Sequence, residues 1–203
     1  MNLDLFSAEN DFIKLDIPDA DVVYYPELFS RNQSDVLFET LLKTIDWQQD
    51  NITVFGKTYP QPRLTALYSN NDQSYSYSNI TMYPKPFTKE LVLIKEKIEP
   101  ISQITFTTCL LNLYRNGQDS NGWHSDNEKE LGKHPVIGSV SLGEERWLYF
   151  KNKKDKNQKH KIKLQHGSLL LMKGKTQEYW LHQIPKTKKV IRPRINITFR
   201  VIK

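Results

Sequence analysis

The stretch RINITFRVI, residues 194 to 202, alternates polar and apolar residues with a period of two. Successive side chains of a β-strand point to opposite faces, so the pattern predicts a strand with one apolar face toward a core. The other face carries Arg194, Asn196, Thr198 and Arg200. On a protein surface this would be an ordinary solvated face. In a strand buried between two sheets, the arginines would need an anion, because unpaired buried charge is costly.

Six further stretches have the composition of short strands. They are rich in β-branched and aromatic residues and are separated by Gly, Asn, Asp, Lys or Pro. They are ITFTTCLLNLY (104–114), VIGSVSLG (136–143), RWLYF (146–150), HKIKL (160–164), GSLLLMK (167–173) and YWLHQI (179–184). Seven short strands at close spacing predict a β-sandwich or jelly roll over residues 104 to 203.

Two helices are expected before these strands. The first opens at the capping-box pattern Ser30 to Gln33, and the second begins at Thr88 and ends near Pro100. Apolar residues recur along one face of each: Leu37, Leu41 and Ile45 in the first, and Leu91, Ile94 and Ile98 in the second. Residues 48 to 86 have the composition of loops and short hairpins. The predicted class is mainly β with flanking helices (α+β), in which two N-terminal helices cover one sheet face.

Length and charge indicate the organisation of the chain. With 203 residues it fits a short extension, residues 1 to 20, and a single domain, residues 21 to 203. The formal net charge is +6, and residues 151 to 163 alone hold seven lysines and one aspartate, also +6. The rest of the chain therefore sums to zero. This segment is either a solvated hairpin tip or a contact for a polyanion such as nucleic acid.

Cys109 is the single cysteine, which excludes a disulfide within the chain. Its apolar surroundings predict a buried, unreactive thiol. The first residues have neither the basic start nor the apolar core of a secretory signal, and no apolar run approaches membrane-spanning length. We therefore expect a soluble cytoplasmic protein of a reducing compartment, with no membrane partner. Nothing in the sequence demands more than a monomer.

His124 and Asp126 are one residue apart, so both can reach one ion from a single strand end. His182, in a later predicted strand, could supply a third ligand. Two imidazoles and one carboxylate form the facial triad of non-haem Fe(II) oxygenases, which leaves positions open for a bidentate keto acid and O2. An arginine would suit a free carboxylate at the far end of that keto acid. The alternative is a coincidental pair, with His182 an ordinary half-buried strand residue.

Several motifs in this part of the chain match one known family in their order. They are NLYRNG, GWHSDNE, PVIGSVSLG, HGSLLLM, WLHQIP and PRINITFR. Together they resemble the AlkB-like Fe(II)/2-oxoglutarate dioxygenases, most closely the members that repair alkylated DNA. The resemblance runs from about residue 105 to the C-terminus, and a weaker likeness reaches back to about residue 50 through VFGK, PR and YSYSN.

The resemblance implies a double-stranded β-helix (jelly roll) and assigns roles to the polar residues. His124, Asp126 and His182 would bind Fe(II). The co-substrate 2-oxoglutarate would be held by Asn112, Tyr114, Arg194, Thr198 and Arg200, with Asn196 alongside. Arg194 would pair with the distal carboxylate of 2-oxoglutarate, and Arg200 would lie near Asp126 at the iron-bound end, where it would assist catalysis.

For the substrate, residues 50 to 86 would form a recognition lid. A methylated base in a duplex must be flipped out to reach a buried iron. Its binding site then needs aromatic side chains that stack on the base and a polar group that hydrogen-bonds to the base edge. Tyr75 and Tyr77 offer two rings, and Glu128 could accept a hydrogen bond from an exocyclic amine. The position of Asn127 also contacts substrate in the resembled enzymes, several of which have an acidic residue there.

The turn at residues 54 to 57 displays Phe55, Gly56 and Lys57. In duplex-acting relatives the matching turn wedges into the base stack. The alternative is a plain hairpin turn with Phe55 packed inward.

These features predict an oxidative demethylase of N-alkylated nucleic-acid bases, with repair of 1-methyladenine or 3-methylcytosine in DNA as the expected role. It would use Fe(II), 2-oxoglutarate and O2 and release succinate, CO2 and formaldehyde. One alternative is a 2-oxoglutarate dioxygenase that acts on RNA, protein or a small molecule, because one fold serves many substrates. A more distant alternative is a non-catalytic nucleic-acid-binding module.

Overall fold

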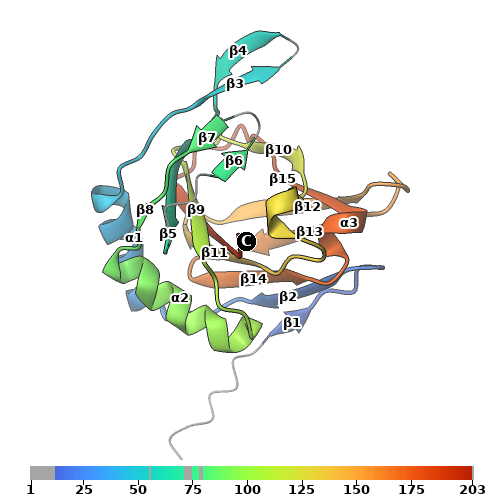
Figure 1. Cartoon of the computed structure of the whole chain (residues 1–203), viewed down its shortest axis with the longest axis horizontal. Coiled ribbons are helices and arrows are strands. Elements are labelled where there is room, and N and C mark those ends of the chain that lie inside the picture. Colours follow the sequence, from blue (N-terminus) through green and yellow to red (C-terminus); the bar gives the residue numbers. More distant parts are fainter. Residues whose placement is uncertain (1–11, 55, 71–74, 78–79, 203) are drawn as a thin grey trace, which may run out of the picture.

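A computed structural model describes residues 12 to 54, 56 to 70, 75 to 77 and 80 to 202 (Figure 1). It has three layers. Two long helices cover the outer side of an eight-stranded sheet, and a four-stranded sheet faces the other side. Two separate two-stranded hairpins lie together at one end of the molecule, at the top of Figure 1.

The larger sheet runs, in spatial order, β1 (Ile13–Lys14), β2 (Asp21–Tyr25), β14 (Ser168–Lys173), β11 (Ile137–Gly143), β16 (Arg194–Arg200), β9 (Thr108–Tyr114), β5 (Leu64–Ser69) and β8 (Lys85–Pro86). The smaller sheet runs β10 (Asn121–His124), β15 (Trp180–Ile184), β12 (Arg146–Asn152) and β13 (Lys159–Leu164). The hairpins are β3 (Asn51–Val54) with β4 (Lys57–Pro60), and β6 (Tyr75–Tyr77) with β7 (Ile80–Met82). The long strands pair antiparallel, and only the short edge strand β8 pairs parallel among the described strands.

All seven strands predicted from composition are present, as β9 and β11 to β16. The description of residues 48 to 86 as loops and hairpins was wrong for β5. Five of its six residues are buried, so both faces of the strand are covered and it lacks the alternation that marks a half-exposed strand. β5 extends the larger sheet beside β9.

The two expected helices are α1 (Arg31–Thr44) and α2 (Lys89–Ser102). The capping box of α1 is formed: Ser30 Oγ accepts from the Gln33 backbone N–H at 3.3 Å, and Gln33 Oε1 accepts from the Ser30 N–H at 3.0 Å. Pro100 lies inside the last turn of α2, so this helix ends slightly later than predicted. The two-helix prediction was also incomplete, because a third helix, α3 (Thr176–Tyr179), is present. Its four residues are too few to show a periodic pattern.

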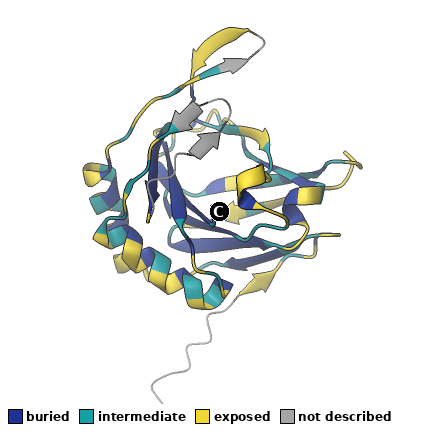
Figure 2. Ribbon diagram, in the orientation of Figure 1, coloured by how far each residue is buried: buried dark blue, intermediate teal, exposed yellow. Residues whose placement is uncertain are grey.

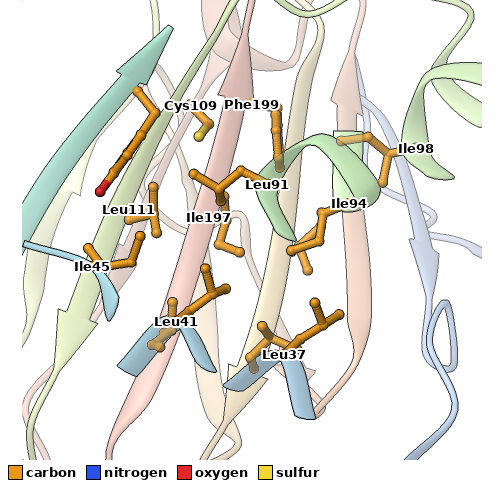
Figure 3. Close-up of a cluster of buried hydrophobic side chains, with 14 of the residues drawn as sticks. Leu37, Leu41, Ile45, Leu91, Ile94, Ile98, Cys109, Leu111, Ile197 and Phe199 are labelled. Carbon is orange, nitrogen blue, oxygen red and sulfur yellow. The ribbon is translucent and has the colours of Figure 1, made fainter. Parts of the chain in front are cut away.

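The apolar faces of both helices pack on the larger sheet (Figure 3). The side chains in this layer include Leu37, Leu41, Ile45, Leu91, Ile94 and Ile98 from the helices, and Cys109, Leu111, Ile197 and Phe199 from the sheet. The apolar face of β16 therefore faces a core, as its alternation predicts. Burial raises the pKa of the Cys109 thiol well above its usual value, which disfavours the reactive thiolate.

A second apolar layer lies between the two sheets. It contains Leu110, Ile137, Leu148, Phe150, Leu170, Met172, Trp180 and Ile184. The central strands of the larger sheet are consequently buried on both faces, as the dark blue arrows of Figure 2 show. The polar face of β16 is thus enclosed between sheets, and Arg194 and Arg200 are only 1% and 4% exposed.

The described part of the expected N-terminal extension packs on the domain. β1 pairs with β2, Ile17 is buried, and the Trp180 indole N–H donates to the Pro18 carbonyl at 2.8 Å. Among the helices of the described residues, none has the length and apolar character needed to cross a membrane.

The helix–sheet layer makes a direct prediction about stability. Leu91 and Leu93 lie on the same helix, but Leu91 is fully buried and Leu93 is 53% exposed. Leu91→Ala should lower the free energy of unfolding by about 2 to 5 kcal/mol, because it removes buried methyl groups and leaves a cavity. Leu93→Ala should lower it by less than about 1 kcal/mol. Urea unfolding of both variants measures the difference, and equal losses would contradict this packing.

Candidate active site

Three possible metal ligands meet at one end of the space between the sheets. His124 ends β10, its neighbour His182 lies on β15, and the two are paired across the strands with ring centroids 4.2 Å apart. Asp126 follows two residues after β10 and is 1% exposed. One ligand atom from each of the three lies within 4.8 Å of the others. The structure therefore brings together the residues that the sequence spacing only allowed to meet.

Hydrogen bonds fix the orientation of these ligands. His124 Nδ1–H donates to the Gly122 carbonyl at 2.8 Å, which leaves Nε2 as the unprotonated nitrogen, 4.0 Å from Asp126 Oδ1. The Asn121 amide donates to the same Nε2 at 3.2 Å. The Asp126 backbone N–H donates to the buried Gln177 side chain at 2.9 Å. Such contacts around a ligand hold it in place and set which ring nitrogen can bind a metal.

The electrostatics of the cluster suit a cation. Burial lowers the pKa of His182 to about 3, with nearby His124 adding to the effect, and burial also lowers the pKa of His124. Burial alone would raise the pKa of Asp126, but Arg200 and the two imidazoles outweigh it and hold that pKa at about 2. Two neutral imidazoles and one carboxylate are thus available near neutral pH. A divalent cation could bind them without displacing a proton.

Arg194 occupies the opposite end of the space. Its Nη2 donates to Ser141 Oγ at 2.9 Å, and its guanidinium lies 5.2 Å from the centroid of the Tyr114 ring. Burial lowers the pKa of Arg194 to about 10, so it is still protonated at neutral pH. Among the described residues, its Nε and Nη1 have no hydrogen-bond partner. A buried cation with free N–H groups fits a carboxylate that comes from outside the chain.

A polar cavity joins the two ends. It is lined by the three possible metal ligands and by Arg63, Asn112, Tyr114, Asn121, Ser139, Arg194, Asn196, Thr198 and Arg200, with apolar side chains between them. Arg200 Nη2 lies 3.0 Å from Asp126 Oδ1, so one arginine is at the metal end and the other at the far end. This arrangement can hold one divalent cation and one dicarboxylate.

Comparison with known proteins agrees with this geometry. The model of the 2OG-Fe(II) oxygenase superfamily matches residues 21–200. The chain belongs to this superfamily. Mouse alpha-ketoglutarate-dependent dioxygenase alkB homolog 3 is 40% identical over 89% of this chain and 66% of its own length. Bovine DNA oxidative demethylase ALKBH2 is 36% identical over 88% of this chain and 68% of its own length. The chain is thus an AlkB homologue that spans about two thirds of the length of these relatives.

The fold also matches a solved structure, titled "The structure of OsALKBH1". The TM-score is 0.65 and the identity 17%, over 89% of this chain and 96% of that one. The mainly β oxygenase fold expected from the sequence is therefore confirmed. The family implies Fe(II) and 2-oxoglutarate, and the donor set of His124, Asp126 and His182 fits that metal.

Several residues that support this oxygenase site were not predicted as site residues. Arg63, just before β5, is buried. It donates through Nε to Asn112 Oδ1 at 2.7 Å and through Nη1 to the Ser120 carbonyl at 3.3 Å. Ser139 accepts from the Asn196 amide at 2.8 Å. Arg63 lies in a stretch interpreted as loops, so its burial had no sequence signal beyond the weak Pro-Arg likeness.

Gln177 is another such residue and makes a testable prediction. Its side chain is buried, and its Oε1 holds the backbone N–H of Asp126. Gln177→Ala should weaken Fe(II) binding about 10- to 100-fold, because Asp126 loses its orientation. Gln183→Ala is the control, since Gln183 is next to His182 on β15 but on the opposite face. Anaerobic calorimetric titration measures both affinities, and equal affinities would show that Gln177 does not position the ligand.

The predicted substrate residues are placed only in part. Phe55 and the side chains of Tyr75 and Tyr77 lie outside the described part of the structure. Gly56, in the turn that joins β3 to β4, has a φ of +76°, and Lys57, the first residue of β4, is exposed. Their contact with nucleic acid stays a prediction.

The other two predicted substrate residues directly follow Asp126 in the chain. Asn127 is exposed and accepts from the Ser125 hydroxyl at 3.0 Å. Glu128 is half-buried and precedes a short 3-10 helix, Lys129–Leu131. Neither side chain is among the cavity-lining residues, and their roles also stay predictions.

The lysine-rich segment forms the hairpin between β12 and β13. Among the described residues, two of its seven lysines have polar partners: Lys163 forms an ion pair with Glu145, and Lys153 Nζ donates to the Gln177 carbonyl at 2.8 Å. Lys154 and Lys156, in the turn itself, are exposed. A phosphate contact through this hairpin would therefore use fewer cations than the sequence alone suggests.

Proposed function

We propose that the chain is an Fe(II)- and 2-oxoglutarate-dependent oxidative demethylase of N-alkylated nucleic-acid bases, with DNA as the principal substrate. One observation carries the proposal. A cavity has the His124, Asp126 and His182 cluster at one end and the buried Arg194, with free N–H groups, at the other. Relatives named for 2-oxoglutarate-dependent dioxygenation and for DNA oxidative demethylation support it.

The chain would hold both cofactors through the residues of this cavity. His124, Asp126 and His182 would bind Fe(II). Arg194 would pair with the distal carboxylate of 2-oxoglutarate, with Tyr114 beneath the guanidinium, and the polar residues Asn112, Asn196, Thr198 and Arg200 would line the rest of its site. With O2, the bound iron and 2-oxoglutarate supply the oxidation of an N-methyl carbon, with release of succinate and CO2, after which the hydroxymethyl group leaves as formaldehyde.

The protein itself would contribute placement and electrostatics. Arg200 keeps Asp126 ionised through their 3.0 Å contact, so the carboxylate stays a ligand at neutral pH. Arg63 holds Asn112 in place at the side of the cavity. The apolar side chains between the sheets, including Leu148, Leu170 and Met172, keep the cavity dry, which strengthens every charge interaction inside it.

On the substrate side, we propose that residues 50 to 86 act as the lid of the domain at residues 21 to 203. The hairpins β3–β4 and β6–β7 lie at one end of the molecule (Figure 1). A groove lined by Ile52, Gln61, Arg63, Asn121, Trp123 and His124 lies between this segment and the metal cluster. A flipped base could enter there, with Tyr75, Tyr77 and Glu128 as its contacts and Phe55 as the wedge in a duplex.

Substrate-dependent turnover tests the proposal. Iron-loaded protein with 2-oxoglutarate and O2 should form succinate faster with 1-methyladenine or 3-methylcytosine DNA than with the same DNA unmethylated. Parallel single-stranded, duplex and RNA substrates would rank the strand and sugar preference. Stimulation by methylated RNA alone would assign RNA as the substrate. Succinate formation that no nucleic acid stimulates would assign the oxygenase to another substrate class.

A further inference from the structure

The outer face of the smaller sheet carries an exposed set of aromatic and basic side chains. We call it the outer platform and define it as Trp123, Trp147, Tyr149, Lys151, Lys159, Lys161 and Lys163. The strand register places these residues on one face: Trp147 is opposite Lys163, Tyr149 opposite Lys161, and Lys151 opposite Lys159. The inner face of the same strands carries Leu148, Phe150 and His182.

Two large aromatic rings are exposed on the outer platform. Trp123 is 37% exposed and Trp147 is 43% exposed. A lysine ammonium lies over each ring, with Lys151 Nζ 4.3 Å from the Trp123 centroid and Lys161 Nζ 4.8 Å from the Trp147 centroid. These pairs hold the rings at the surface beside positive charge.

The charge of the outer platform has one sign. The four strands β10, β15, β12 and β13 contain no Asp or Glu over their whole described length. Acidic residues lie in the turns beside these strands: Glu144 and Glu145 before β12, where Glu145 neutralises Lys163, and Asp155 between β12 and β13. Among the residues that the structure describes, no acidic side chain forms an ion pair with Lys151, Lys159 or Lys161. A polyanion is therefore the ligand that the face attracts.

The outer platform contains a groove, and its Trp123 end borders a second groove beside the active site. A groove of about 290 Å³ lies along Trp147 and Tyr149, with residues between 185 and 191 as its other wall and with Glu144 and Glu145 also in its lining. At the other end, Trp123 lines the groove that leads to His124 and Arg63. A nucleic-acid strand that leaves the groove beside His124 and Arg63 can thus continue over the face from Trp123 toward Trp147.

We propose that the outer platform binds a single-stranded nucleic-acid segment that flanks the target base. The identity of this ligand rests on the proposed function. Trp147 and Tyr149 stack on unpaired bases, and Lys161 contacts the phosphates. Single-stranded segments are favoured over duplex because only unstacked bases offer their faces to aromatic side chains. The two aromatic positions are two residues apart on one strand, roughly 7 Å, so they can serve successive bases.

Binding of unmethylated DNA tests the platform separately from catalysis. The full chain, loaded anaerobically with Fe(II), is titrated against 5- and 20-nucleotide single strands of about equal composition, with fluorescence anisotropy as the readout. Trp147→Ala and Lys161→Glu should each weaken binding of the longer strand about tenfold and change binding of the shorter strand far less. A longer strand offers more positions at which the protein can bind. Each variant is therefore compared with wild type on the same strand, for which this number is equal.

Lys97→Glu is the charge-matched control, because Lys97 is exposed on α2, on the far side of the larger sheet. Lys161→Ala should also reduce the slope of log affinity against log salt by about 0.7, the loss of one phosphate contact on a single strand. An abasic 20-nucleotide strand should bind wild type and Trp147→Ala equally. The proposal is overturned if both platform variants, folded by thermal melting, bind the longer strand as Lys97→Glu does. Because no turnover is involved, this outcome would leave the proposed demethylation intact.

Discussion

Replacing His182 by Ala is expected to lower turnover at least about a thousandfold and to abolish tight Fe(II) binding. His182 supplies one of the three ligand atoms that lie within 4.8 Å of one another, and it is buried where water cannot readily replace the imidazole. Asp126→Ala should have the same effect and should also leave Arg200 as a buried cation without its carboxylate. Succinate formation and anaerobic iron titration measure the two consequences.

The matched control is His134→Ala. His134 lies outside the cluster, 3.8 Å from Glu178, and its side chain is partly exposed. This variant should retain wild-type iron affinity and turnover. If His182→Ala kept activity within about tenfold of wild type, the metal cluster would not be the centre of the reaction.

Replacing Arg194 by Met is expected to raise the KM for 2-oxoglutarate about a hundredfold. Met keeps much of the length of the side chain but removes the buried guanidinium, whose Nε and Nη1 have no partner among the described residues. The effect should depend on the distal carboxylate. The keto acid 2-oxovalerate, in which a methyl group replaces that carboxylate, should be a poor co-substrate for wild type and about as good as 2-oxoglutarate for the variant.

Arg192→Met serves as the control, because Arg192 is exposed just before β16. It should keep the wild-type preference for 2-oxoglutarate over 2-oxovalerate. An Arg194→Met variant that kept this preference would show that the distal carboxylate binds elsewhere in the cavity.

The fold was largely predictable because its main strands have strong local patterns. β16 alternates strictly, and this alternation also predicted correctly that Arg194 and Arg200 share a face opposite Ile197. The helix starts at Ser30 and Thr88 followed from capping residues. β5 was missed because burial on both faces removes the alternation, and α3 because one turn shows no period.

The site was predictable to a smaller extent. Sequence spacing allowed His124 and Asp126 to share an ion, but the meeting with His182 depends on the pairing of β10 with β15, fifty-eight residues apart at the two histidines. No local pattern encodes that pairing, so the family resemblance supplied it. The buried partners Arg63 and Gln177 contact the site through tertiary packing alone. The outer platform became visible only when the register of β12 and β13 placed Trp147 and Lys161 on one face.

The proposed function is that this cavity removes methyl groups from nucleic-acid bases. Its most direct test is the mass of a 1-methyladenine oligonucleotide incubated with anaerobically iron-loaded protein, to which 2-oxoglutarate and O2 are then added. We expect loss of one methyl group per oligonucleotide, with formaldehyde and succinate in equal amounts, and no loss with His124→Ala. An unchanged mass in both single-stranded and duplex DNA, with iron bound and succinate formed, would contradict it.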